Sequence, residues 1–195
     1  MRISMMLVPI TAVLALAGSV LVSPAIADDK CQQASGDEAI AACTRIIQNH
    51  ETSTKYRAAA YYNRGVLYRD KGDHDRAIAD YNEAIRLDPE YAAAYTNRGL
   101  AYRAKGDHDR AIADHNEAIR LDPKLAQAYI NRGVAYDAKG DYDRAIADYN
   151  EAIRLDPKYP SAYYNRGLAK KSKGDAAGGD TDIAKARELN PNIGR

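Results

Sequence analysis

The stretch Tyr61–Pro89, YYNRGVLYRDKGDHDRAIADYNEAIRLDP, decides the fold of this protein. It returns almost unchanged at Tyr95–Pro123 and Tyr129–Pro157, and a divergent fourth copy spans Tyr163–Pro191. The triplet Asn-Arg-Gly recurs in the copies with a constant step of 34 residues. Because one short repeat cannot bury its apolar face alone, this period predicts a solenoid in which each unit packs on its neighbours.

Each copy is predicted to contain two helices joined by a tight turn. Small and aromatic residues follow the helical spacing in both halves, at Tyr61, Gly65 and Tyr68 and then at Ala77, Tyr81 and Ala84. Between them, Gly72 is suited to end the first helix and Asp73 to cap the second. Pro89 ends the second helix, because the residue before a proline is pushed out of the α region.

This pattern resembles the tetratricopeptide repeat, whose units carry a large aromatic residue, Gly, Tyr, Ala, an aromatic residue, Ala and Pro in that order. Residues 58–193 are similar to it, and the second copy carries His115 in the second aromatic position. The resemblance implies an all-α, right-handed superhelical solenoid of helix-turn-helix repeats. One departure is general, because an Arg stands before each Gly where the family usually has an aliphatic residue.

These arginines have a repeated partner on the second helix of each copy. The arginines are Arg64, Arg98, Arg132 and Arg166, and the repeated acids are Asp80, Asp114, Asp148 and Asp182. The arginine lies about 60° from the buried stripe, at the edge between the two helices. We therefore expect structural ion pairs at this edge.

The period divides the sequence into units 1 to 4, at residues 58–91, 92–125, 126–159 and 160–193. Unit 4 is degenerate and is expected to cap the C-terminal end, with a second helix organised from Asp180. The polar outer face that a terminal repeat needs is assigned to Asp182, Lys185 and Glu188.

Two segments precede the repeats. Residues 28–57 are interpreted as a degenerate N-terminal half-repeat, in which Cys43 takes the place of the buried aromatic residue. Residues 1–27 are typical of a secretory signal peptide, with Arg2, an apolar run and the small-residue site Ala25-Ile26-Ala27. An uncleaved anchor is the alternative, because the apolar run is nearly long enough to span a bilayer.

Cleavage after Ala27 would give an exported protein of bacterial type, periplasmic or secreted, that starts at Asp28 and has no further membrane span. In such an oxidising compartment, Cys31 and Cys43 on facing helices favour a disulfide. The alternative is a pair of buried thiols that pack as small apolar groups. Redox catalysis is not expected, because the spacing of the two cysteines is not C-x-x-C.

Several function classes have no support in the sequence. The formal net charge is +1 with acids and bases interleaved, which gives no footprint for nucleic acid. Phosphate-binding loops, nucleophile elbows and metal-ligand spacings are missing, so no enzyme activity, cofactor or metal is expected. His74 and His108 are interpreted as solvated turn residues, and His115 as a core residue.

The candidate binding residues lie on the side of each first helix that faces away from the packed stripe. In the family this side lines the concave surface. One amide recurs per unit, at Asn63, Asn97, Asn131 and Asn165. Its flanking residues are Tyr62, Tyr164, Val66, Leu100, Val134, Leu168, Arg69, Arg103 and Lys171.

An amide both donates and accepts, so such a line can hold a peptide backbone without reading its sequence. Related repeat proteins use an asparagine ladder in this way. The alternative is that the amides bond neighbouring side chains and solvent. The clamp by which some tetratricopeptide domains bind chaperone C-termini is matched only in its Asn part, so that partner is not implied.

The resulting hypothesis is a non-catalytic protein–protein interaction module that binds an extended peptide or partner segment, of unknown identity, in the concave groove. The alternative is a self-associating structural scaffold of the cell envelope, which would be a homo-oligomer.

Overall fold

The computed structural model describes residues 30–31 and 35–194. The predicted signal peptide and its cleavage site lie outside these residues. The described residues form helices and the turns between them. The helices are α2 (Gly36–Gln48), α3 (Thr54–Asp70), α4 (His74–Leu87), α5 (Ala92–Ala104), α6 (His108–Leu121), α7 (Ala126–Ala138), α8 (Tyr142–Leu155), α9 (Pro160–Ser172) and α10 (Ala176–Leu189).

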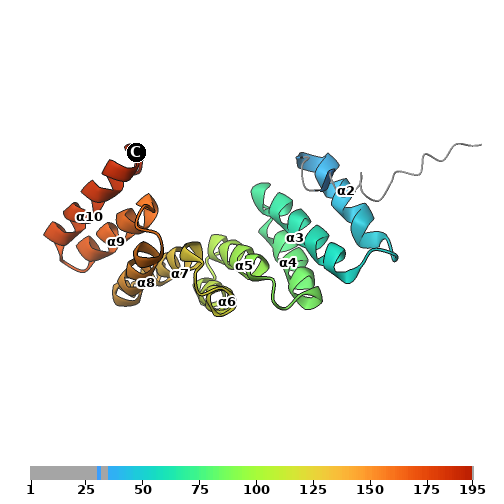
Figure 1. The fold of residues 1–195 in the computed structure, drawn as a ribbon, viewed down its shortest axis with the longest axis horizontal. Helices are drawn as coiled ribbons and strands as arrows, with labels where there is room; N and C mark the ends of the chain where they lie inside the picture. Colours follow the sequence, from blue (N-terminus) through green and yellow to red (C-terminus); the bar gives the residue numbers. More distant parts are fainter. Residues whose placement is uncertain (1–29, 32–34, 195) are drawn as a thin grey trace, which may run out of the picture.

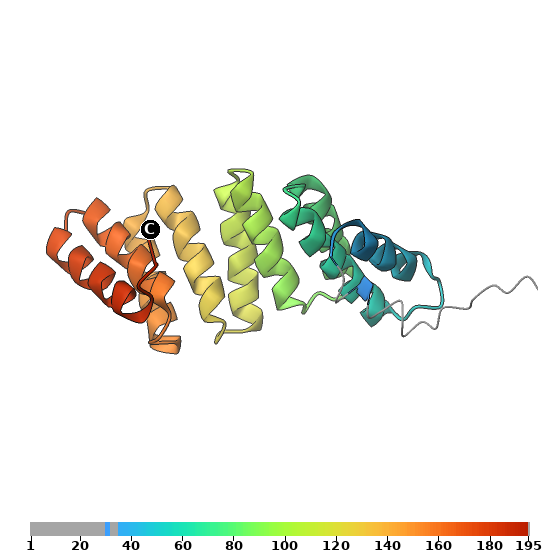
Figure 2. The ribbon, with the colours of Figure 1, turned by 90° about the horizontal axis from the view of Figure 1, so that it is seen from above.

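The helices form antiparallel pairs that follow one another along an arch (Figure 1). Seen from above, the pairs stand side by side in sequence order (Figure 2). Each helix packs against the next in sequence, and α3, α5, α7 and α9 also touch in succession, whereas α4, α6 and α8 do not touch one another. The first helices of the units therefore line the inner, concave side of the described arch. The predicted all-α solenoid of helix-turn-helix repeats is confirmed.

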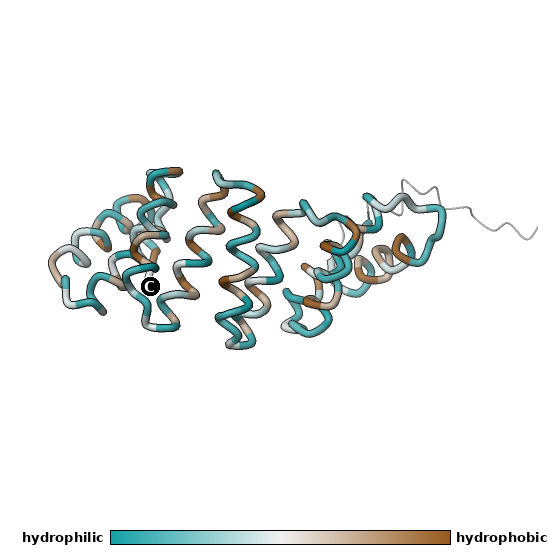
Figure 3. The backbone as a smooth tube through the Cα atoms, turned by 90° about the horizontal axis from the view of Figure 1, so that it is seen from below, coloured by the Kyte–Doolittle hydropathy of each residue, from teal (hydrophilic) through white to brown (hydrophobic). Residues whose placement is uncertain are grey.

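Apolar and polar residues alternate every few positions along the helices (Figure 3). This is the pattern of a solenoid whose helices each bury a narrow stripe. In the part of the protein that the structure describes, no helix is long and apolar enough to cross a membrane.

The two helices of a unit approach closely where glycine meets the large side chain of the second helix. A Cβ atom at Gly99 would lie 2.7 Å from Cε1 of His115, and one at Gly65 equally close to Tyr81. Tyr81 and His115 are fully buried. A larger residue at these glycines must therefore push the helices apart, because a packed seam has no room for added atoms.

The turn between the helices has the predicted chemistry. Gly72 adopts φ +78°, a left-handed conformation that ends α3. The side chain of Asp73 then accepts a hydrogen bond from the backbone N–H of Arg76 and caps α4. Asp107, Asp141 and Asp175 cap the later second helices in the same way.

The predicted ion pairs at the seam are present and extend to the preceding unit. In unit 2, Arg98 donates to both carboxylate oxygens of Asp114, at 2.8 and 2.6 Å, and its remaining nitrogen donates to Asn82 Oδ1 at 2.7 Å. We call this arrangement the arginine clamp. Arg132 and Arg166 repeat it with Asp148 and Asn116, and with Asp182 and Asn150. Each arginine therefore joins three helices.

The N-terminal helix α2 takes the place of a second helix in front of unit 1. Arg64 pairs with Asp80, and its remaining nitrogen donates to Thr44 of α2 at 2.9 Å, as Arg98 does to Asn82. Cys43 is fully buried at the position of Tyr81, and its sulfur lies 2.16 Å from that of Cys31. The two cysteines thus lie at disulfide distance.

The C-terminal helix differs from the expectation in two ways. α10 begins at Ala176 and not at Asp180, because the Asp175 cap starts the helix despite the two glycines that follow. Asp182 is 5% exposed and pairs with Arg166 and Lys170, so assigning it to the outer face was wrong.

The polar end face comes instead from two residues that replace isoleucines. Asp180 stands at the position of Ile78, and Arg187 stands at that of Ile85. In the other units these isoleucines are at least partly buried, whereas Asp180 and Arg187 are exposed. α10 therefore presents charge where a further unit would need an apolar surface.

The arginine clamp predicts a large difference between two arginines of unit 2. Arg98→Met leaves the carboxylate of Asp114, 5% exposed, without its counter-charge, and should lower the free energy of unfolding by about 3–5 kcal/mol. Arg120→Met removes only an exposed i,i+3 pair with Glu117 and should change it by about 0.5 kcal/mol or less. Urea unfolding of both variants checks this, and equal effects would contradict the clamp.

His115 predicts an acid sensitivity located in unit 2. Burial, with smaller effects of Arg103 and Arg132, lowers the pKa of His115 from 6.5 to about 4. Below pH 6.5 the unfolded protein takes up a proton that the folded protein refuses, so stability falls as the pH falls toward 4. At pH 5 the loss is about 2 kcal/mol.

His115→Tyr, which installs the residue of units 1 and 3, should remove this part of the acid dependence of unfolding. His108→Asn is the control, because His108 is the first residue of α6, beside the turn and outside the seam, and this variant should follow the wild type. Urea midpoints measured from pH 7.5 to pH 4.5 give the comparison. Parallel curves for wild type and His115→Tyr would count against a neutral, buried His115.

Candidate peptide-binding surface

The predicted binding residues lie on the inner side of the arch but differ in accessibility. The half-buried ones are Tyr62, Asn63, Val66, Arg69, Asn97, Leu100, Val134, Tyr164 and Asn165. The exposed ones are Arg103, Leu168 and Lys171, whereas Asn131 is 8% exposed and counts as buried. The four amides are therefore not equivalent.

Asn97 is held by its neighbours. Its Nδ2 donates to the hydroxyl of Tyr62 at 3.0 Å and to the carbonyl of Ala93 at 2.9 Å, and its Oδ1 accepts from Arg69. Burial raises the pKa of Tyr62, so this hydroxyl stays protonated at neutral pH. Both amide protons of Asn97 therefore form hydrogen bonds within the protein. For this residue the structure fits the alternative that the asparagines bond neighbouring groups, and not an amide that is free for a ligand.

Asn131 stands at the end of a series of hydrogen bonds. The hydroxyl of Tyr159 donates to Oε1 of Gln127, and Nε2 of Gln127 donates to Oδ1 of Asn131 at 2.9 Å. Within the described residues, Nδ2 of Asn131 is buried and has no partner. The amide of Asn131 therefore keeps two unused donors.

The two outer amides make fewer contacts. Nδ2 of Asn63 lies 3.9 Å from the sulfur of Cys31, which is a weak interaction at most. Among the described residues, Asn165 has no hydrogen-bond partner for its side chain. Asn165 is half-buried, so water reaches its amide.

The apolar part of the surface combines side chains from both ends of the arch. Val66 packs with Tyr62 at the edge of the core around Tyr81, and the ring of Tyr62 lies 4.9 Å from that of Tyr91. At the other end of the arch, Leu168 is 41% exposed. A single exposed apolar side chain of this kind is ordinary on a protein surface, so Leu168 offers apolar contact to a partner without marking a site by itself.

The cations along this side are mostly neutralised within the protein. Arg69 pairs with Asp70 at 2.7 Å, and Lys171 pairs with Asp180 at 2.8 Å. Arg103 has no ion pair among the described residues. Unit 3 carries Asp137 at the same position, where desolvation raises the pKa of the carboxyl group. The positive charge expected from the sequence is therefore concentrated at Arg103.

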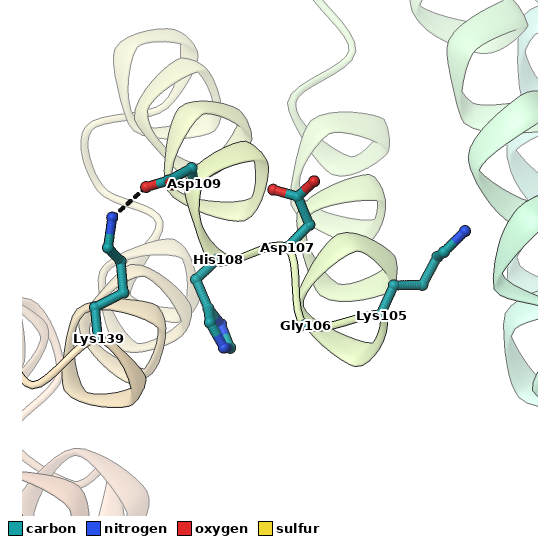
Figure 4. Close-up of a pocket in the computed structure, with 6 residues that line it drawn as sticks. All are labelled: Lys105, Gly106, Asp107, His108, Asp109 and Lys139. Carbon is teal, nitrogen blue, oxygen red and sulfur yellow. Dashed lines mark hydrogen bonds and ion pairs between the residues drawn. The ribbon is translucent and has the colours of Figure 1, made fainter.

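A second feature lies at the turns and was not identified from the sequence. Residues 105–109 and Lys139 line a hollow of about 380 Å³ between units 2 and 3, crossed by the ion pair of Lys139 with Asp109 (Figure 4). A hollow of about 390 Å³ repeats it at residues 71–75 and Lys105. His74 and His108 are half-buried there, each with a buried Nδ1 that has no partner, and are not fully solvated as expected. The repeated sequence Gly-Asp-His-Asp is the feature of the sequence that could have indicated these hollows.

The described residues contain no group of three or more His, Cys, Asp or Glu side chains placed to hold a metal ion. In each hollow the lysine that follows pairs with an aspartate of the turn, Lys139 with Asp109 and Lys105 with Asp75.

Comparison with known proteins bears on both the fold and the surface. A family model for the TPR repeat matches residues 65–103, 99–140 and 136–174, which together cover more than half of the protein. A search of curated proteins found no match. Among solved structures, a crystal structure of MamA is 29% identical with a TM-score of 0.72, covering 80% of this protein and 88% of that one.

Two further structures are informative. MamA 41-end from Desulfovibrio magneticus RS-1 is 20% identical with a TM-score of 0.75, covers 88% of this protein and 94% of that one, and shows the fold alone. The first TPR of Spaghetti (RPAP3), bound to the HSP90 peptide SRMEEVD, is 27% identical with a TM-score of 0.60 and covers 62% of this protein and 95% of that one. With the repeat pattern, the helix pairs and the family model in agreement, the protein belongs to the tetratricopeptide repeat (TPR) family.

Proposed function

We propose that this protein is a non-catalytic interaction module that binds an extended segment of a partner protein along the inner side of α3, α5, α7 and α9. Similarity to TPR structures, one of them bound to a peptide, supports a role in protein interaction. The inner side offers apolar side chains next to amides, which suits a segment with both a backbone and side chains to bind.

The observation that carries this proposal is where the nearly identical copies differ. The first three units vary at partly or fully exposed positions of the inner side, at Ala59, Ala93 and Gln127, at Val66, Leu100 and Val134, and at Arg69, Arg103 and Asp137. In contrast, α4 and α6 differ only in Tyr81 and His115. Duplication alone would leave all positions alike, so the variation favours a surface adapted to a ligand.

The binding amides are assigned unequal roles. Asn131 has two unused N–H donors on a buried nitrogen, which a small movement would expose, and Asn165 is accessible to water. Asn97 must exchange its bonds to Tyr62 and Arg69 for bonds to a ligand, which costs most of what it gains. We therefore expect units 3 and 4 to contribute more binding than unit 2.

The envelope-scaffold alternative has less support. End-to-end stacking would place a new first helix against α10, where Asp180 and Arg187 replace the isoleucines that make this contact elsewhere. Burying Arg187, and Asp180 together with its ion-pair partner Lys171, is unfavourable.

The central test uses a partner identified by cross-linking in intact cells and mass spectrometry. Replacing Asn63, Asn97, Asn131 and Asn165 by Ala should abolish most of the capture of that partner. Each neutral hydrogen bond contributes about 0.5–1.5 kcal/mol, so a single replacement should weaken binding about tenfold at most. The affinity is measured with the purified partner by calorimetry.

The matched control replaces Arg86, Arg120 and Arg154, which are exposed on the second helices, by Ala. It should bind like the wild type. Circular dichroism of both variants must show the wild-type helical content, since Asn97 also bonds within the protein. Wild-type capture by the folded quadruple variant would refute groove binding and leave the scaffold alternative.

We further propose that the protein is exported and carries a Cys31–Cys43 disulfide. The leader sequence supports export, and the burial of Cys31 and Cys43 in one core cluster, in a protein bound for an oxidising compartment, supports the bond. The intact mass of the protein from a periplasmic fraction should lack residues 1–27 and two further hydrogens. Protein that retains residues 1–27 in the membrane fraction would contradict export, and two alkylated thiols would contradict the disulfide.

A further inference from the structure

The buried apolar core of the array is interrupted in unit 2. One cluster of buried residues around Tyr81 includes Ala101 of α5, and another around Tyr149 spans units 3 and 4. Within the part of the chain that the structure describes, no buried residue of α6 belongs to either cluster, and only the half-buried Ile112 packs against the second one. The break in the core therefore falls between α5 and α6.

Two polar substitutions account for this break. Thr96 stands where unit 3 has the buried Ile130, and His115 stands where it has Tyr149. Both ring nitrogens of His115 are buried and have no hydrogen-bond partner among the described residues. The seam of unit 2 therefore gains less from its large side chain, because the desolvation of the imidazole is not offset by hydrogen bonds.

The arginine clamp is the tie that remains across this seam. Arg98 donates to both carboxylate oxygens of Asp114, and the other units have the same pair. Opening unit 3 would break its clamp and also expose the apolar cluster around Tyr149, whereas opening unit 2 breaks the clamp and exposes small residues and His115. Because the stability of a solenoid is a sum of local contributions, unit 2 should be the interior unit that opens most easily.

The charged groups around His115 disfavour its protonated form while the seam is closed. Arg103 of α5 and Arg132 of α7 both oppose a positive charge on the ring. Asp114, the neighbouring residue on α6, is already paired with Arg98 of α5. Burial, with the smaller effects of the two arginines, lowers the pKa of His115 from 6.5 to about 4. An open unit 2 takes up a proton that the closed unit refuses, so acid favours opening.

We propose that unit 2 is an acid-sensitive hinge, at which the seam between α5 and α6 opens while the blocks α2–α5 and α7–α10 keep their fold. The seam lies near the middle of the arch (Figure 1), so its opening changes how the two halves of the inner side face each other. The inference goes beyond the proposed function and does not rest on it. A segment bound across α5 and α7 would hold the hinge closed, because it would bind the closed arch more tightly than the open one.

The size of the acid effect follows from the two pKa values of His115. Between pH 7.5 and pH 5, protonation in the open form alone multiplies the opening constant about thirtyfold. The clamp does not produce this difference, since desolvation raises the pKa of Asp114 in unit 2 and that of Asp148 in unit 3 alike. A thirtyfold change is therefore expected in unit 2 alone.

The test places one thiol in each of three equivalent seams. Ala111 of α6 lies one helical turn before His115 and is fully buried, and Ala77 of α4 and Ala145 of α8 are its buried counterparts. Each alanine is replaced by Cys in the otherwise unchanged protein. Labelling by dithiodipyridine, which also reacts with thiols in acid, is measured at pH 7.5 and pH 5 relative to glutathione at the same pH. Mass spectrometry identifies the labelled position.

Labelling at Ala111→Cys should rise about thirtyfold from pH 7.5 to pH 5, whereas labelling at Ala77→Cys and Ala145→Cys should rise about threefold or less. Adding His115→Tyr to the Ala111→Cys protein should remove the rise. Adding Tyr81→His to the Ala77→Cys protein should create a rise in unit 1, which tests the same mechanism if His115→Tyr does not fold.

Equal rises at the three positions would mean that acid opens the whole fold, and they would overturn the hinge. A flat response at Ala111→Cys would do the same, as would an unchanged rise after His115→Tyr. Circular dichroism should show the same helical content at pH 5 as at pH 7.5, and a large loss of helix would also count against two blocks that stay folded. The labelling needs no partner, so the hinge and the proposed groove can fail separately.

Discussion

The arginine clamp is the interaction on which the rest of the structure depends. A guanidinium has five N–H donors in one plane, and here it meets a carboxylate on one second helix and an amide on the preceding one. Asp114 is 5% exposed, so its charge can be buried only when Arg98 occupies this place. An aliphatic residue, which is usual here in the family, would give apolar contact without these hydrogen bonds. The clamp ties the two helices of a unit to each other and to the second helix of the preceding unit.

The clamp and the glycine seam hold the helices of the array together, and the first helices add contacts on the inner side, where Ile130 is buried and Asn97 bonds Tyr62 and Arg69. The first helices touch one another there through side chains that vary from unit to unit, such as Tyr62, Thr96 and Ile130. A solenoid with nearly identical outer helices and a variable inner side can change what it binds without changing how it folds. This arrangement explains how nearly identical units can give a surface whose asparagines have different partners.

The fold was predictable from the sequence because its determinants are local. The 34-residue period, the Gly-Asp turns and the arginine–aspartate spacing are visible within one unit, and the structure confirms them. The surface was predictable only in outline. Which side faces inward follows from helical periodicity, but the partners of Asn97 and Asn131 come from other helices or from Gln127, and the pattern of repeated asparagines hides that difference. The start of α10 was placed too late in the sequence, because helix propensity alone does not show that the Asp175 cap outweighs the unfavourable Gly178 and Gly179.

The repeated geometry of the clamp also bears on how such an array changes length. Oδ1 of Asn82 accepts a hydrogen bond from Arg98, and Oδ1 of Asn116 accepts one from Arg132, at 2.7 Å in both cases. Loss of residues 92–125 in one event would therefore bring Asn82 to Arg132 and recreate the junction, and gain of the same block would insert another copy of it. Evolution can thus lengthen or shorten the arch in whole units without inventing a new interface. The charged end of α10 cannot move inward in this process, so growth is confined to the interior.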